Sequence, residues 1–243
     1  MDNNFKNSAT LISFVLSGSL IVSTLIGAYT FYRVRSFDNA LVVTGSAKQA
    51  VIADTVKWIA TFNRVVELGN MKFGYEQMDR DLDLVKKFYL DKGFAEKDLT
   101  ISPVFMEEVW DPDNRGDAKR YILRRTIEIN SNEVENISSI ANNSGELITA
   151  GVIFSTQSLQ YFYSKLPELR VSLLSAAIAD AKARASEIAK AGNKKIGGLK
   201  AASSGVVQVL SENSIEISDY GAYDTSNINK EVMVTVKATF YLR

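Results

Sequence analysis

The residue types that most often carry out chemistry are missing from this chain. Its 243 residues include no histidine and no cysteine. Histidine is the commonest general base and metal ligand, and the cysteine thiolate is a common nucleophile. Without them the chain lacks imidazole-dependent catalytic triads, thiol chemistry and disulfide bonds. The sequence therefore predicts a protein that is not an enzyme and that holds no metal or other cofactor.

One acidic segment partly resembles a calcium-binding loop. Asp111, Asp113 and Gly116 fall at positions 1, 3 and 6 of such a loop. However, Arg115 places a cation at position 5, and Ile122 occupies position 12, where a bidentate glutamate is needed. A polar hairpin turn over residues 111–117 is the better interpretation.

Two other polar stretches also have structural interpretations. The glycine-rich stretch 192–198 follows a predicted helix, lacks the spacing of a phosphate-binding loop, and reads as a helix stop. Four charged residues of that helix fall off its apolar stripe and predict a solvated face: Asp180, Lys182, Arg184 and Glu187.

The remaining candidate residues are better explained as parts of a surface that contacts another chain. Arg124 and Arg125 are adjacent in a predicted strand and must point to opposite faces. The inward one needs a partner such as Glu128 or a carboxylate of a neighbouring subunit, which hints at an interface. Tyr121 lies on the same strand.

A run of three aromatic residues gives a second hint of an interface. In Tyr161, Phe162 and Tyr163, at least one ring must face away from the core of the domain. Burial against another chain is a use for such a ring. The polar loop from Ser211 to Asn229 is a further candidate contact region.

The chain that carries these residues divides into an N-terminal apolar segment and a folded domain, called the body below. No charged residue lies between Lys6 and Arg33, and about 20 apolar helical residues suffice to cross a bilayer. A cleaved signal peptide and a buried core helix fit this run less well, because it is long and has no polar face. We predict a tail over residues 1–7, a transmembrane anchor over 8–32, a linker over 33–40 and one folded domain over 41–243.

The anchor has a candidate packing face of its own. Ser19, Ser23 and Gly27 are spaced by four residues, a pattern that lets membrane helices approach one another closely. Lys6 and the terminal amine precede the anchor, whereas Arg33 and Arg35 follow it. This balance does not decide which side of the membrane the body occupies.

Periodicity in the body predicts an α+β fold with helices packed on a mainly antiparallel sheet. Alternation in Val56, Trp58, Ala60 and Phe62 predicts a half-buried strand, and Gly45 marks a bulge or a close approach. Extended runs at 99–110 and 119–130 should pair. The body should contain a helix from Met71 that is closed by Gly93, a short helix capped by Ser131, and a strand from Gly151. A closing strand should carry Val232 to Phe240.

The longest helix is predicted over residues 167–191, with Pro167 in its first turn and Gly192 just past its end. It is rich in alanine, which lets a helix lie close to a sheet. The residues of its predicted buried stripe are Val171, Leu174, Ile178, Ala181, Ala185 and Ile188.

The order of these segments resembles the SIMPL-domain family of envelope proteins. The resemblance covers residues 41–243 and rests on VTGSAKQAVIADTVKWIATF, YILRRTIEI, LSAAIADAKARASEIAKAGNKKIGGL and VMVTVKATFYL in that order. Ser46 follows Gly45 near a position where the family pattern has a second glycine. The resemblance implies an extracytoplasmic domain, a ring- or cage-like homo-oligomer and a link to envelope and oxidative stress. It supplies no established catalytic residues.

Taken together, the sequence predicts a single-pass protein of the inner membrane with its domain in the periplasm or another extracytoplasmic space. Its expected partners are further copies of itself and, through residues 8–32, the bilayer. Lys plus Arg and Asp plus Glu are 28 each, so no net charge favours nucleic acid. A tethered monomeric module that binds a ligand or lipid is the alternative.

Overall fold

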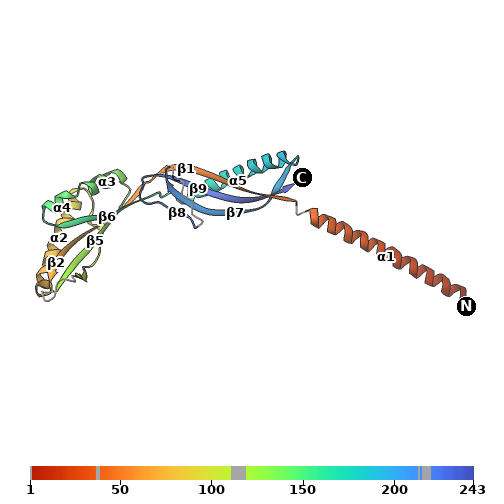
Figure 1. The fold of residues 1–243 in the computed structure, drawn as a ribbon, viewed down its shortest axis with the longest axis horizontal. Coiled ribbons are helices and arrows are strands. Elements are labelled where there is room, and N and C mark those ends of the chain that lie inside the picture. The colour runs from red at the N-terminus through yellow and green to blue at the C-terminus, as the bar shows by residue number, and fades with distance from the viewer. Residues whose placement is uncertain (1, 37–38, 111–118, 213, 215–219) are drawn as a thin grey trace. The chain divides into compact units, whose positions relative to one another are not determined.

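The computed structural model describes residues 2–36, 39–110, 119–212, 214 and 220–243. Mainly antiparallel strands and interspersed helices confirm the predicted α+β class (Figure 1). Two compact units emerge: unit 1 is Met1–Ala47, Leu173–Gly205 and Val234–Arg243, and unit 2 is Lys48–Ser172 and Val206–Met233. In chain order the helices and strands are α1 (Asp2–Ser36), β1 (Ala40–Ile52), β2 (Thr55–Glu67), α2 (Met71–Asp91), β3 (Leu99–Ile101), β4 (Phe105–Glu108), β5 (Arg120–Ser131), α3 (Val134–Asn142), α4 (Gly145–Thr149), β6 (Ile153–Phe162), α5 (Leu166–Ala191), β7 (Ile196–Ser211), β8 (Ala222–Tyr223) and β9 (Asn229–Leu242).

Helix α1 carries the predicted apolar run. The segment Ser13–Val34 has a mean hydropathy of 1.7, is long and apolar enough to cross a membrane, and is not buried within the chain. Its large side chains, such as Leu20 and Leu25, are mostly exposed. A helix whose apolar surface is left uncovered by its own chain suits a single-pass membrane anchor.

Unit 1 is held together where α5 lies against strands. Ala181 and Ala185 pack with Val43, Ala238 and Phe240 in one buried cluster. The approach is so close that a Cβ added to Gly45 would lie 2.2 Å from the carbonyl oxygen of Ala177. This confirms Gly45 as a close-approach residue. The Ser46 backbone N–H also donates to the Asp180 carboxylate at 2.9 Å, so Asp180 ties α5 to β1.

The buried stripe of α5 differs from the predicted one. Val171 and Ile188 were expected to be buried, but they are 68% and 52% exposed. Small residues explain the difference at Ile188, because Ala185 and Ala189 allow a close approach that a larger side chain would prevent, whereas near Val171 the buried positions belong to Leu169 and Leu173. The buried residues recur every four positions: Leu169, Leu173, Ala177, Ala181, Ala185 and Ala189.

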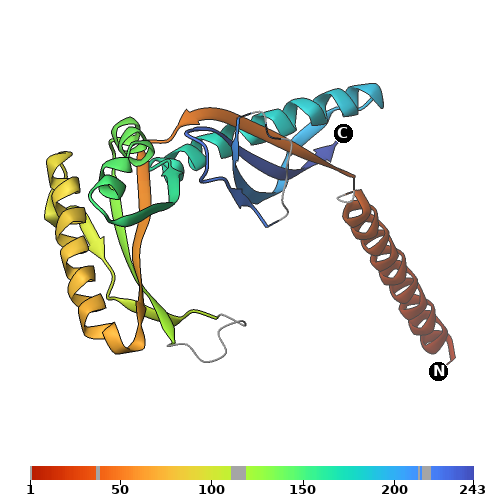
Figure 2. The same cartoon turned by 60° about the vertical axis from the view of Figure 1, so that its left-hand side comes forward.

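Unit 2 is built on a five-stranded antiparallel sheet in the order β3-β5-β2-β6, with β4 also paired to β5. Helices α2, α3 and α4 pack on this sheet (Figure 2). The alternation predicted for β2 is confirmed, since Val56, Trp58, Ala60 and Phe62 are fully buried. The other strands, β1, β9, β7 and β8, form a sheet in that order, in which β8 runs parallel to β7.

Trp58 lies at the centre of unit 2. Its ring lies 5.1 Å from Tyr89 of α2 and 6.2 Å from Phe154 of β6, between ring centroids. The indole N–H donates to the Thr156 hydroxyl at 3.2 Å. This one side chain of β2 therefore contacts both helix α2 and strand β6.

Most of the predicted helix ends are confirmed, and one is corrected. Gly93 follows α2 with φ of +95°, and its N–H donates to Leu90 O. Gly192 follows α5 directly and its N–H donates to Ala189 O at 3.1 Å, but the left-handed residue there is Asn193, with φ of +55°. Ser131, however, does not cap α3, because its hydroxyl accepts the N–H of Glu133, one residue before the helix begins. The hairpin turn 111–117, with its calcium-loop alternative, lies outside the described residues.

Candidate functional site

The predicted contact residues of β5 lie on two different faces of the sheet. Tyr121 and Arg125 pair with Val66 and Phe62, which places them on the face that the helices cover. Arg124 points to the opposite face, where its guanidinium lies 3.9 Å from the Glu107 carboxylate and both side chains are exposed. The three residues therefore do not form one surface.

Arg125 finds its partners in its own chain, which corrects the expected pairing. Its Nε donates to Ser102 O at 3.1 Å, and Nη1 lies 3.3 Å from the Asp79 carboxylate of α2. Glu128, the partner named from the sequence, instead forms an ion pair with Lys57 at 2.7 Å. The inward arginine therefore gives no argument for a neighbouring subunit.

The aromatic run 161–163 is also engaged within the chain. Tyr161 is 8% exposed, and its hydroxyl hydrogen-bonds with Ser138 at 2.9 Å, so its ring belongs to the core and not to a contact surface. Phe162 packs on Tyr223 with ring centroids 5.8 Å apart, and the Tyr163 N–H donates to the Tyr223 hydroxyl at 3.0 Å. Phe162 and Tyr163 keep partly exposed rings. Strand β8, which supplies Tyr223, lies within the predicted loop 211–229.

The two edges of the five-stranded sheet differ in composition. The β3/β4 edge is interrupted by Pro103 and carries Glu107 and Glu108, features that discourage pairing with another strand. The β6 edge reads IFSTQSLQYF, ten residues with no charge and no proline. In the described part of the chain, β2 alone pairs with β6, and a register shift at Ile59/Ala60 makes a bulge there. Apart from this bulge, the β6 edge lacks the charges and the proline that protect the β3/β4 edge.

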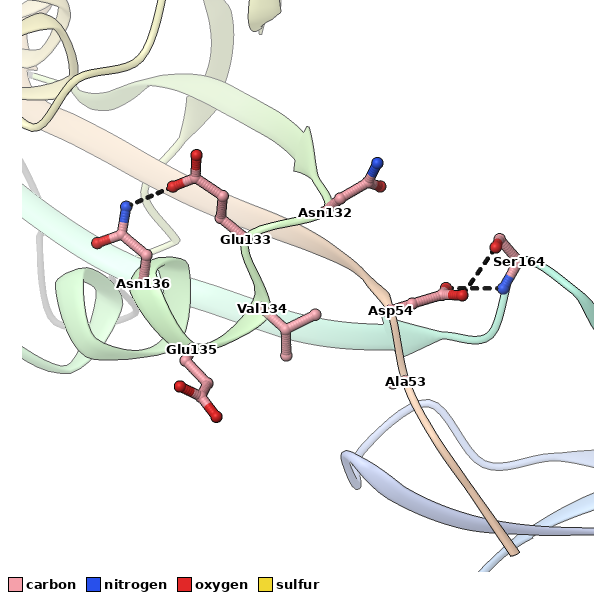
Figure 3. Close-up of a pocket in the computed structure, with 8 residues that line it drawn as sticks. All are labelled: Ala53, Asp54, Asn132, Glu133, Val134, Glu135, Asn136 and Ser164. Carbon is pink, nitrogen blue, oxygen red and sulfur yellow. Dashed lines mark hydrogen bonds between the residues drawn. The ribbon is translucent and has the colours of Figure 1, made fainter.

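A polar hollow opens where β2 begins (Figure 3). It has a volume of about 690 Å³, and the residues that line it are Ala53, Asp54, Asn132, Glu133, Val134, Glu135, Asn136 and Ser164. Three of these carry carboxylates and none carries a positive charge. The lining suits hydrogen-bond donors or a cation better than an acyl chain.

Asp54 is the best-connected carboxylate in this hollow. It accepts hydrogen bonds from the N–H and the hydroxyl of Ser164, both at 2.8 Å, and from Thr55 at 3.2 Å. Burial alone would raise the pKa of Asp54, but the bonds from Ser164 and Thr55 bring it below its ordinary value. Glu133 accepts from the Asn136 amide at 2.7 Å. Asp54 therefore joins the start of β2 to the segment that leads into α5.

The hollow does not assemble a recognisable catalytic or metal centre. The Ser164 hydroxyl donates a hydrogen bond to the Asp54 carboxylate, and the lining offers no imidazole or amine to activate Ser164 as a nucleophile. Among the described residues, no group of three or more acidic side chains is placed to hold a metal ion.

Two buried charges were missed from the sequence. Asp81 of α2 is 2% exposed and accepts a bidentate pair of hydrogen bonds from Arg64 at 2.6 and 2.8 Å. Arg64 also donates to Gly151 O at 2.8 Å. The burial of Asp81 could have been predicted from the sequence, because Asp81 stands three residues after Met78 and four before Val85, on the apolar stripe of α2.

Lys230 is the second buried charge. Its ammonium donates to the backbone oxygen of Asp224 and lies 5.7 Å from the centroid of the Tyr223 ring. Burial lowers the pKa of Lys230, and the Asp224 carboxylate partly opposes this effect. Lys230 is in phase with Val232 and Val234, the buried alternation of β9, which is the signal that could have found it.

The small residues of the anchor lie on α1 as predicted, within its exposed apolar surface. The Ser19 hydroxyl donates to Leu16 O at 2.9 Å, so its polar group is satisfied within the helix. A groove of about 410 Å³ on α1 is lined by Gly18, Ser19, Val22, Ser23 and Ile26. Nothing in this single chain tests helix packing through this face.

Comparison with known proteins identifies the family. A family model described as SIMPL, a protein of unknown function (DUF541), matches residues 41–240. A search of curated proteins found no match. Among the described residues, the matched region contains the helices after α1 and all the strands, except the first residue of β1 and the last two of β9. Because this match covers most of the chain, the protein belongs to the SIMPL family.

Proposed function

We propose that this protein is a non-enzymatic domain, tethered to a membrane by α1, that assembles with further copies of itself through the β6 edge. The observation that carries the proposal is the uncharged, proline-free outer edge of β6. The lack of histidine and cysteine supports a role in binding or scaffolding rather than in catalysis.

A second copy is the occupant that fits this edge best. Two β6 strands can lie antiparallel without bringing like charges together, whereas the β3/β4 edge would oppose its own glutamates. The Tyr161 N–H already donates to Thr225 O at 2.8 Å, which leaves residues 153–160 as the open part of the edge. Anchoring in one membrane also raises the local concentration of copies.

The location and biological role follow from the family resemblance. We place the domain on the extracytoplasmic side of the inner membrane, in a ring- or cage-like assembly linked to envelope and oxidative stress. The exposed apolar α1 supports the single-pass tether.

Cysteine cross-linking in native membranes tests the contact. The chain has no cysteine, so a single one introduced by Ser155→Cys, Gln157→Cys or Ser158→Cys is the only thiol present. In a two-fold antiparallel pair, the residue nearest the axis faces its own copy at about 4.5–5.5 Å between Cα atoms, within disulfide reach. We expect efficient dimer formation on mild oxidation at one of these positions and not with Ser139→Cys on α3. Equal cross-linking at all four positions, or none at β6, would contradict the proposed edge.

The acidic hollow supports a second candidate, a tethered monomer that binds a small polar or cationic ligand near Asp54. Native mass spectrometry of the detergent-extracted protein separates the two functions. A single chain with a retained small molecule would favour the binding module, and a defined multimer would favour assembly.

A further inference from the structure

The neutral chain is divided into two oppositely charged units. The residues of unit 1 include eleven Lys and Arg against four Asp and Glu, a formal net charge of +7. The residues of unit 2 include 17 against 24, a formal net charge of −7. Unit 1 also contains the membrane anchor, so the positive charge is concentrated in the unit that enters the bilayer.

Much of this positive charge gathers at one end of unit 1. Lys190, Lys194 and Lys195 are exposed at the end of α5 and line a recess of about 540 Å³. The backbones of Lys195 and Arg243 exchange two hydrogen bonds of 2.9 and 2.8 Å, which brings the end of β9 to the same place. We call Lys190, Lys194, Lys195 and Arg243 the basic cluster. In the described part of the chain, none of these four side chains forms an ion pair.

On α5, the acidic residue nearest to this cluster is Glu187, which precedes Lys190 by about one turn. The dipole of α5 favours cations at its C-terminal end, but this effect does not account for Arg243, which follows β9, or for Lys200 on β7. Lys200 lies over the ring of Tyr241, with 5.6 Å from its Nζ to the ring centroid.

Covalent reach places the cluster at the membrane surface. The apolar span ends at Val34 and α1 at Ser36, only three residues before Asn39. Two helical steps and three extended ones reach at most about 14 Å. The Asn39 carbonyl accepts the N–H of Leu242 at 2.9 Å, beside the Lys195 and Arg243 pair. Flexible lysine side chains therefore need only a short reach to the lipid headgroups.

We propose that the basic cluster binds anionic lipid headgroups of the bilayer that α1 enters. Phosphate-bearing headgroups are strong acceptors for ammonium and guanidinium donors, and a recess lined by three lysines can take one. The acidic unit 2 is repelled by the same anionic surface. The bound cluster therefore holds unit 1 on the membrane surface. This inference rests on α1 as an anchor and is independent of self-assembly.

Energy transfer from a single label tests the proposal in the full-length protein. Gly198→Cys provides a labelling position because no atom lies within 4 Å of an added Cβ. The labelled protein is placed in nanodiscs of phosphatidylcholine alone, or of equal parts phosphatidylcholine and phosphatidylglycerol, with an acceptor dye on a headgroup. We expect greater transfer in the anionic nanodiscs, and loss of the excess at about 1 M salt, where the screening length falls to ~3 Å.

Matched variants assign the effect to the cluster. Each lysine near an anionic surface raises the bound-to-free ratio roughly fivefold, so Lys194→Gln with Lys195→Gln should lower that ratio about 25-fold. Lys72→Gln with Lys87→Gln removes the same charge from exposed positions of α2 and should leave the transfer unchanged. Equal transfer in both lipid compositions would overturn the proposal. An equal loss with both double variants would also overturn it, because total charge would then explain the effect.

Discussion

Replacing Arg64 by alanine should destabilise unit 2 by about 3–5 kcal/mol, the range found when one partner of a buried ion pair is removed. Asp81 is 2% exposed and takes both of its close hydrogen bonds from Arg64. Without the guanidinium, its carboxylate stays in the core with no cation beside it. The Gly151 carbonyl also loses a hydrogen bond from Arg64.

Removal of the other partner should cost less. The Arg64 side chain is 28% exposed, so after Asp81→Asn it can still be hydrated and can still donate to Gly151 O. We expect a loss of about 1–3 kcal/mol for Asp81→Asn, the cost of one weakened charge-assisted pair. The prediction is therefore that Arg64→Ala lowers the free energy of unfolding more than Asp81→Asn does.

Trp58 fluorescence provides the assay. Trp110 is 87% exposed, so Trp110→Phe leaves the fully buried Trp58 as the only indole and as a reporter of the unit 2 core. Urea unfolding in that background gives the free energy of each variant. Arg124→Ala is the control, because its exposed pair at 3.9 Å should contribute about 0–1 kcal/mol. Equal costs for Arg64→Ala and Arg124→Ala, or a greater cost for Asp81→Asn than for Arg64→Ala, would refute the reasoning.

Three further changes test other parts of the fold. Gly45→Val should cost about 3 kcal/mol in thermal unfolding, since its Cβ would collide with the backbone of α5, whereas Gly198→Ala, in open space, should stay within about 1 kcal/mol. Because its bonds to Ser164 lower the folded pKa of Asp54 below the ordinary 3.8, the carboxylate stabilises the fold above that pH and less as the pH falls through the folded pKa. The stability difference between wild type and Asp54→Asn, measured by urea unfolding, should therefore shrink below about pH 3.8, and a constant difference would contradict this origin. Tyr161→Phe should cost about 1 kcal/mol through its lost hydrogen bond without changing the mass of the assembly, and a change in mass would return Tyr161 to a contact surface.

The sequence predicted those parts of the fold that depend on local periodicity. Alternation in Val56 to Phe62 marked β2, and Gly93 marked the end of α2, because strand pleating and left-handed glycines leave direct local signals. The stripe of α5 was misplaced for a physical reason. The helix presents small residues to Gly45, and a hydrophobic pattern gives alanine too little weight against Ile188.

The candidate contacts were harder to predict because they depend on which strands become neighbours. Arg125 and Asp79 are far apart in sequence and meet only when α2 packs on the sheet, so the expected pairing with Glu128 was wrong. In the same way, the sequence of β6 alone cannot show that the Tyr161 hydroxyl bonds to Ser138 of α3. Charge partition between the two units also appears only once the strands that compose each unit are known.

The mass of the full-length protein in mild detergent tests self-assembly through β6 most directly. We predict one defined multiple of the 26.9 kDa chain for the wild type and for the control Ser139→Lys with Asn142→Lys on α3. Ser155→Lys with Gln157→Lys places the same charge on β6 and should yield a smaller species with an unchanged far-UV circular dichroism spectrum. A wild-type mass equal to a single chain, or a β6 variant as large as the wild type, would contradict the account.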